Sequence, residues 1–213
     1  MAITKTYIGV DMNAWTTFLS GTGLFSSVTL EDNTITCKNE NNDTVLTITY
    51  TLSSGQDTWQ FTVFLTGNNS FTKSYSLTGG SAGENYGCKC ENGVILYFNG
   101  STGYMSIMIT KNNHGAPTFI LPNSTSAKTT IYCLTYEDTV PVKSYQITNT
   151  SATQTVLSPF ITNAAEGQTS YTPNAFYMSF GPYVDRGLAK FIMNGKIYLT
   201  NGILVISDGQ VSI

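Results

Sequence analysis

The sequence predicts a mainly β protein, with antiparallel sheets in a sandwich or barrel-like arrangement and one short helix near the N-terminus. Near its end, three turn dipeptides follow one another about every seven residues: Asn194-Gly195, Asn201-Gly202 and Asp208-Gly209. Asn-Gly and Asp-Gly accept positive φ at both central turn positions, so they favour two-residue β-hairpins. The composition supports the same class, because the chain contains 13 Tyr and 11 Phe, which favour strands, whereas only 11% of its residues are charged.

One helix is predicted near residues 12–20. Asp11 or Asn13 can cap its N-terminus, because a side-chain oxygen at that position accepts a hydrogen bond from a free backbone N–H. Trp15, Phe18 and Leu19 follow at helical spacing and form one apolar stripe, which we expect to pack on a sheet.

Strands are predicted over most of the remaining first 138 residues. Their expected positions are 2–8 (an edge strand), 26–30, 34–39, 44–51, 58–65, 71–76, 104–110, 118–121 and 129–136. In the 44–51 segment we expect Leu46, Ile48 and Tyr50 to face the core, with Val45, Thr47 and Thr49 on the other face. Turns at Asn92-Gly93 and Asn99-Gly100 are expected to delimit another strand, with Ser101-Thr102-Gly103 lengthening the second loop.

A domain boundary is predicted at Glu137–Pro141, where two acids and a proline interrupt the strand pattern. This divides the chain into a β-rich domain, 1–138, and a smaller β domain, 139–213, that ends in the meander. Strands are expected at 142–149, 155–161 and 175–180, and loops at 163–174 and 181–187.

The turn spacing predicts a register for the C-terminal four-stranded meander. Two-residue turns pair Ile192 with Ile197, Leu199 with Leu204, and Ile206 with Val211. One face is then entirely apolar, and the other is mixed and contains the candidate interface residues Phe191, Met193, Tyr198, Ile203 and Val205. Either a loop of the same chain covers this mixed face or another subunit does.

No catalytic or metal-binding constellation is recognisable in the sequence. His114 is the only histidine and lies in an Asn-Asn-His-Gly turn, so a hydrolase base next to a nucleophile is not indicated. The four cysteines, Cys37, Cys88, Cys90 and Cys133, lack the CxxC pairs of zinc sites, and we expect mostly free thiols, with a disulfide or a metal site as alternatives. We therefore expect no cofactor and no enzymatic activity.

Charge and hydropathy limit the classes of partner that the sequence predicts. The net charge is −3 and the lysines are scattered, which argues against nucleic acid. No apolar run approaches the ~18 residues of a membrane span, and no signal peptide is recognisable, so we expect synthesis in a cytoplasm. The aromatic and amide side chains of two late loops form a candidate carbohydrate site: Tyr171, Asn174, Tyr183, Asp185 and Arg186.

Three segments carry a resemblance: MNAWTTFLSGTGLFSSV, GYMSIMITKNNHGAPTFIL and NGKIYLTNGILVISDG. They resemble segments of virion structural proteins from tailed phages of Gram-positive gut bacteria. The resemblance implies a cofactor-free protein present in many copies in a tail, a baseplate or a head decoration, with itself and other virion proteins as partners. A symmetric oligomer assembled through sheet surfaces is the leading hypothesis. The alternatives are a carbohydrate- or receptor-binding module, within the virion or as a free lectin-like protein, and an enzyme on cell-wall polysaccharide that would use Glu137 or Asp185.

Overall fold

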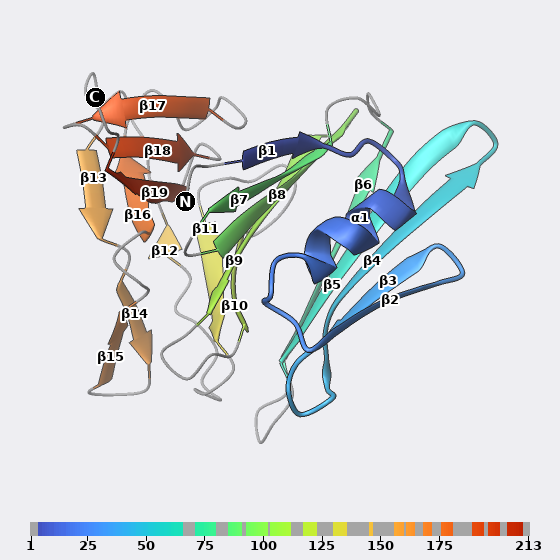
Figure 1. Cartoon of the computed structure of the whole chain (residues 1–213), viewed down its shortest axis with the longest axis horizontal. Coiled ribbons are helices and arrows are strands. Elements are labelled where there is room, and N and C mark those ends of the chain that lie inside the picture. Colours follow the sequence, from blue (N-terminus) through green and yellow to red (C-terminus); the bar gives the residue numbers. More distant parts are fainter. Residues whose placement is uncertain are drawn as a thin grey trace.

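The computed structural model describes most of the first half of the chain and the strands of the second half. The described residues are 4–65, 71–79, 85–90, 93–101, 103–111, 117–122, 130–135, 145–146, 156–159, 161–164, 168–171, 176–180, 189–193, 196–200 and 204–210. The fold is mainly β and sandwich-like, as the sequence predicts, with antiparallel sheets and one short helix among the described residues (Figure 1). No helix in these residues is long and apolar enough to cross a membrane.

The first layer is a five-stranded antiparallel sheet whose strands follow chain order. It consists of β2 (Ser27–Glu31), β3 (Thr34–Lys38), β4 (Thr44–Ser53), β5 (Gln56–Leu65) and β6 (Phe71–Thr78). Asp32 and Asn33 both have positive φ (46° and 58°), which is the geometry of a two-residue hairpin turn between β2 and β3. The strands predicted at 58–65 and 71–76 are found as β5 and β6, which pair with each other.

The second layer is a seven-stranded sheet. Its order is β1 (Thr4–Tyr7), β7 (Tyr86–Cys90), β8 (Gly93–Gly100), β9 (Gly103–Lys111), β10 (Pro117–Pro122), β11 (Thr130–Thr135) and β12 (Tyr145–Gln146). The N-terminal strand lies at its edge, as predicted, and pairs with β7. One prediction is wrong in part: Asn99 and Gly100 belong to β8, and Gly100 pairs with Gly103, so the loop expected over 99–103 is shorter than predicted.

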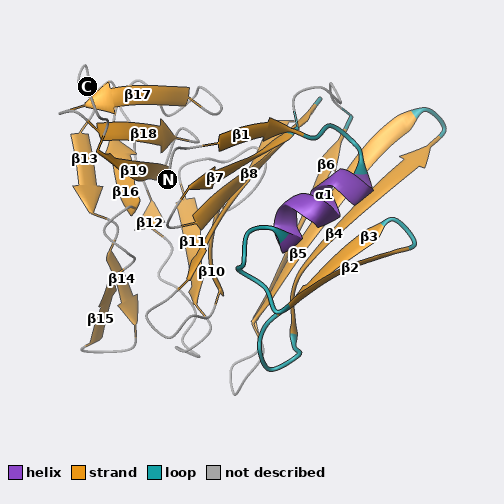
Figure 2. Ribbon diagram, in the orientation of Figure 1, coloured by secondary structure: helices purple, strands orange, loops and turns teal. Residues whose placement is uncertain are grey.

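Helix α1 (Met12–Ser20) lies where the sequence places it, between the β2–β3 edge of one sheet and β7 of the other (Figure 2). The Asp11 carboxylate accepts from the Ala14 N–H at 3.0 Å and so caps the first turn. Trp15 and Leu19 are fully buried, and Phe18 is half-buried against Gly87 of β7. The Lys89 ammonium group donates a hydrogen bond to the Gly21 carbonyl at the C-terminal end of the helix.

An aromatic cluster joins the helix and the two sheets. The ring of Phe98 on β8 lies 4.6 Å from Trp15, 4.9 Å from Trp59 and 4.5 Å from Phe61, measured between centroids. All four side chains are buried. Offset and tilted aromatic pairs stabilise a fold beyond the contribution of the apolar area that they bury. Phe98 therefore holds together three elements that are distant in the sequence.

Strand β8 is buried on both of its faces. Gly93 to Phe98 are all buried. Val94, Leu96 and Phe98 face the five-stranded sheet, whereas Ile95 and Tyr97 belong to the opposite face, where Tyr97 stacks on Tyr86 at 4.7 Å. A strand buried on both faces is apolar without alternation, which explains the continuous Val-Ile-Leu-Tyr-Phe run.

A third sheet contains the strands of the C-terminal region. Its order is β13 (Val156–Pro159), β16 (Phe176–Phe180), β19 (Leu204–Gln210), β18 (Lys196–Thr200) and β17 (Ala189–Met193), and a separate hairpin pairs β14 (Ile161–Ala164) with β15 (Gln168–Tyr171). The loop predicted at 163–174 is therefore wrong in part, because β15 and the end of β14 lie within it. The domain boundary near 138 stays a prediction, and β12, beyond it in the chain, pairs with β11 of the seven-stranded sheet.

The predicted meander is confirmed at its first turn and wrong at the other two. Ile192 pairs with Ile197, as expected. At the second turn, however, Thr200 pairs with Val205 and Leu199 with Ile206, two residues later than predicted. A shift of two residues preserves the alternation between faces, whereas a shift of one would invert it. Asp208-Gly209 lies inside β19 instead of forming a hairpin turn, and β16 pairs with β19.

Candidate functional site

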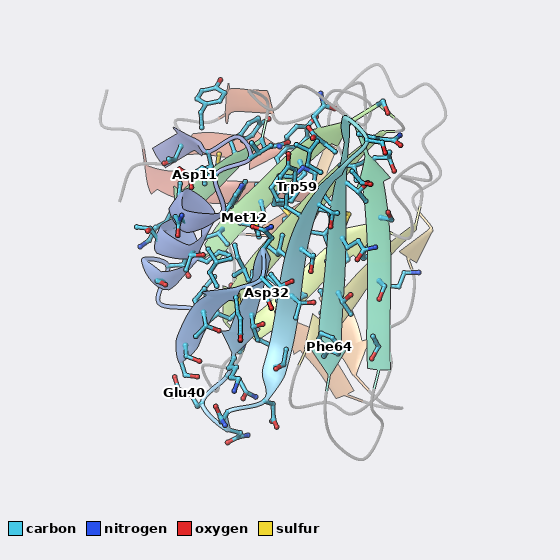
Figure 3. The ribbon with its side chains drawn as sticks, turned by 90° about the vertical axis from the view of Figure 1, so that its right-hand side faces the viewer. Asp11, Met12, Asp32, Glu40, Trp59 and Phe64 are labelled. Carbon is cyan, nitrogen blue, oxygen red and sulfur yellow. The ribbon has the colours of Figure 1, made fainter. Side chains whose placement is uncertain are left out.

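The outward side of the five-stranded sheet is covered by hydroxyl side chains, and we call it the hydroxyl face. Figure 3 looks onto this side, where the side chains of β4, β5 and β6 project away from the core and end in oxygen atoms. Paired residues share a face, so the register gives its rows across the strands. These rows are Thr36–Thr47–Thr62–Ser74, Thr34–Thr49–Gln60–Ser76 and Thr51–Thr58–Thr78.

The hydroxyl face is ordered by cross-strand contacts and stays accessible. The hydroxyl groups of Thr34 and Thr49 lie 3.0 Å apart, and those of Thr62 and Ser74 lie 3.1 Å apart, both within hydrogen-bonding distance. Gln60, Ser74 and Ser76 are exposed, and the threonines of the first two rows are half-buried by their neighbours. The face is therefore a regular layer of hydroxyl and methyl groups, with no described element packed on it.

The sequence forms this face by strict alternation along each strand. In Thr34-Ile35-Thr36-Cys37 the threonines point outward, while Ile35 and Cys37 are fully buried. Leu46 and Ile48 face the core, as predicted. Val45, predicted to share the outward face with Thr47, is instead fully buried, because the β3–β4 register shifts between Cys37 and Lys38.

From β3 to β6 the rows of the hydroxyl face contain no charged residue and consist of threonine, serine and glutamine. On β2, Glu31 pairs with Thr34 and continues the second row, and Lys38 lies on the outward side at the end of β3. Strand propensity explains the threonines. It does not explain why lysine and glutamate, which commonly occupy solvent-facing positions, are absent from the rows between β3 and β6.

Phe64 stands out on this side of the sheet. Its register partner is Thr72, so it belongs to the outward set. It is half-buried and is not part of the apolar core, and Figure 3 shows it near the end of β5. An aromatic ring at a sheet surface beside hydroxyl groups offers an apolar contact at one end of the polar face.

The β4–β5 hairpin extends beyond both neighbouring strands, and we call residues 51–56 the projecting hairpin. The β3–β4 ladder ends at Thr49 and the β5–β6 ladder ends at Thr58, whereas the β4–β5 ladder continues to Ser53 and Gln56. Ser54 and Gly55 have φ of 53° and 76°, so they form a two-residue turn of the primed type. All six residues are exposed, and Leu52 is 63% exposed.

The base of the projecting hairpin is fixed to the sandwich. The Tyr50 hydroxyl donates to the Asp57 carboxylate at 2.9 Å, and the Tyr50 N–H donates to the Asn33 carbonyl at 3.1 Å. Burial, followed by the hydrogen bond and the negative charge of Asp57, raises the pKa of Tyr50. The hairpin therefore has a base that is fixed to the sandwich and a tip whose residues are exposed.

The residues predicted from sequence as an interface are only partly described. Phe191 pairs with Tyr198 and Met193 with Lys196, while Val205 pairs with Thr200 on one side and Tyr177 on the other. These pairings put four of the candidates in one sheet at backbone level. Ile203 lies outside the described residues.

The candidate ligand residues are not brought together in the described part of the chain. Tyr171 ends β15 and pairs with Ile161, while Asn174, Tyr183, Asp185 and Arg186 lie outside the described residues, as do His114 and Glu137. Within the described part, no group of three or more His, Cys, Asp or Glu residues is placed to hold a metal ion. Cys37 is free and buried, and burial raises the pKa of its thiol, while Cys88 is also buried.

Comparisons with known proteins provide no relative: no family model matches the chain, and no curated protein or solved structure matches it significantly. A function must therefore be inferred from the hydroxyl face and the projecting hairpin. Sequence reasoning missed the hydroxyl face as a site, although the alternating threonines of residues 34–36 and 47–51 were a signal for it.

Proposed function

We propose that the protein is a non-catalytic structural subunit that assembles with copies of itself, as a part of a phage tail, baseplate or capsid decoration. The observation that supports this most directly is the projecting hairpin. In this hairpin, β4 and β5 extend beyond the neighbouring strands of the sheet, and Leu52 is exposed near the tip.

The hairpin has the properties of an assembly element. Among the described residues, the hairpin's own two strands are the only ladder partners of residues 51–56, so the outer edges of both strands present backbone N–H and C=O groups. Such edges pair readily with a strand of another chain, because main-chain hydrogen bonds supply affinity without special side chains. Leu52 adds an apolar contact at the same place.

The low charge of the chain favours association between copies. A net charge of −3 with 11% charged residues gives little electrostatic repulsion between identical subunits. A small area per contact is then enough when many copies meet, since the contacts in a symmetric assembly act together. The assignment to a virion depends on the sequence resemblance and is the more specific part of the proposal.

The assembly role is tested by light scattering on the whole chain after size exclusion. We expect wild-type protein to exceed the mass of one chain, and Leu52→Lys to reduce that mass, because it places a charge at the tip without removing a core contact. Thr17→Lys, at an exposed helix position, is the control and should assemble as wild type does. A wild-type chain that stays monomeric at high concentration, or a Leu52→Lys variant that assembles normally, contradicts the proposal.

The virion assignment needs a separate measurement. Mass spectrometry of purified particles should detect the chain in a fixed ratio to the other structural proteins. Its absence from particles would refute this assignment and leave the assembly role to the light-scattering result.

A further inference from the structure

We propose that the hydroxyl face, together with Phe64, is a docking surface for an uncharged polysaccharide. This goes beyond the assembly role and uses different residues apart from Thr51, which belongs both to the third row and to the projecting hairpin.

The absence of charge on the rows between β3 and β6 selects the class of partner. A nucleic acid or an anionic membrane surface is bound through clustered lysines and arginines. The rows contain none, and the two charged residues at the β2–β3 margin, Glu31 and Lys38, have opposite signs. A neutral partner is therefore the one that this surface can cover without leaving a charge unpaired.

The hydrogen-bonding groups distinguish a polysaccharide from a protein partner. Each Thr or Ser hydroxyl both donates and accepts, and Gln60 contributes an amide with both capacities. A sugar chain presents hydroxyl groups of the same kind on every unit, so it can match such a layer along its length. A protein covering the face would leave many of these groups unsatisfied, at a cost for each one, and protein interfaces are depleted in serine.

The geometry fits a polymer better than a single sugar. Neighbouring residues of the face are ~4.8 Å apart across the strands and ~6.7 Å apart along them, as the spacing of paired strands and alternating residues requires. The face is open, whereas small ligands are bound in concave pockets that bury most of their surface. A polymer in contact with several rows gains from many weak contacts that act together.

Phe64 supplies the apolar contact that a sugar ring requires. Its half-buried side chain lies on the outward side, opposite Thr72, and is not among the described residues of the apolar core. The C–H groups of a pyranose ring can lie on an aromatic face while its hydroxyls bond to the neighbouring threonines. Phe64 would thus anchor one end of the bound chain.

The test is co-sedimentation of the whole protein with insoluble neutral polysaccharides, for which cellulose and chitin are the probes, and with polygalacturonate gel as the anionic comparison. We expect retention on at least one neutral polymer, insensitive to added salt because charge contributes nothing. Phe64→Ala and the double variant Thr47→Val/Thr62→Val should each weaken retention by about tenfold, as loss of an aromatic contact or of two hydroxyls implies. Thr17→Val, on the helix, is the matched control and should bind as wild type does.

Three outcomes would overturn the proposal. The first is a wild-type chain that neither neutral polymer retains. The second is retention unchanged in Phe64→Ala and in the double threonine variant. The third is a change of oligomeric mass in the face variants by light scattering, which would make this face a contact between copies. Thermal unfolding of each variant confirms that the fold is kept.

Discussion

Replacing Gly87 with alanine should disturb the packing of helix α1 on the seven-stranded sheet. A Cβ at this position would lie 2.3 Å from the tip of the Phe18 ring, well inside van der Waals contact. We expect a cost of ~1–3 kcal/mol for the overpacking, offset in part by ~0.5–1 kcal/mol because alanine loses less backbone entropy than glycine in a strand. The net loss of unfolding free energy is then about 0–2.5 kcal/mol.

The cause is tested by a double-mutant cycle with Phe18→Ala. Removing the ring also removes the clash, so Gly87→Ala should become neutral or stabilising by up to ~1 kcal/mol in that background. The expected coupling between the two sites is about 1–3 kcal/mol. Urea unfolding of the four proteins, followed by circular dichroism, gives the values.

Gly93→Ala is the control for this cycle. Its Cβ would lie 2.3 Å from the Ile109 carbonyl oxygen, a backbone atom on the neighbouring strand, and the Phe18 ring is not among its nearest neighbours. Its cost should therefore be the same with and without the Phe18 ring. If the losses of unfolding free energy in Gly87→Ala and Phe18→Ala are additive, the Phe18 ring does not pack against Gly87 as described.

Two further predictions concern ionisable groups. Burial raises the pKa of Cys37, so the folded state binds the thiol proton more tightly than the unfolded state does. The free energy of unfolding is therefore unaffected below the unfolded thiol pKa of ~8.5. Above that pH it falls, by up to ~1.4 kcal/mol per pH unit. Urea titrations from pH 7 upward should show this decline in wild type and a shallower one in Cys37→Ala; equal slopes would contradict it. Lys89→Met should cost ~0.5–1 kcal/mol, since the ammonium group no longer bonds the Gly21 carbonyl at the helix C-terminus. A loss that does not shrink at high salt would show that charge is not its cause.

The sequence predicts the elements of the first half well because their signals are local. Asp11 and the Trp15–Leu19 stripe define the helix by capping and periodicity, and both are found in the structure. The strand from Trp59 to Val63 alternates without exception, and its apolar face is buried as expected. The fold class follows from the same local patterns.

The failures occur where tertiary pairing decides between equivalent local choices. Asp208-Gly209 has the chemistry of a hairpin turn, yet it lies inside β19, where the β18–β19 register shifts between Lys196 and Tyr198. Asn99-Gly100 lies in β8, where both residues pair with β9. A turn-forming dipeptide permits a turn but does not require one, and long-range pairing of the strand that contains it overrides the local preference.

The hydroxyl face shows a different reason why a site escapes detection from sequence. Thr36, Thr47 and Thr62 are separated by up to 26 residues in the chain, and only the register of three strands brings them into one row. In the sequence, each threonine is an ordinary polar residue of an alternating strand. Chemistry that arises from repetition across strands has no local motif, so a search for clustered catalytic side chains does not detect it. The projecting hairpin escapes for the same reason, because it is defined by where the neighbouring strands β3 and β6 end.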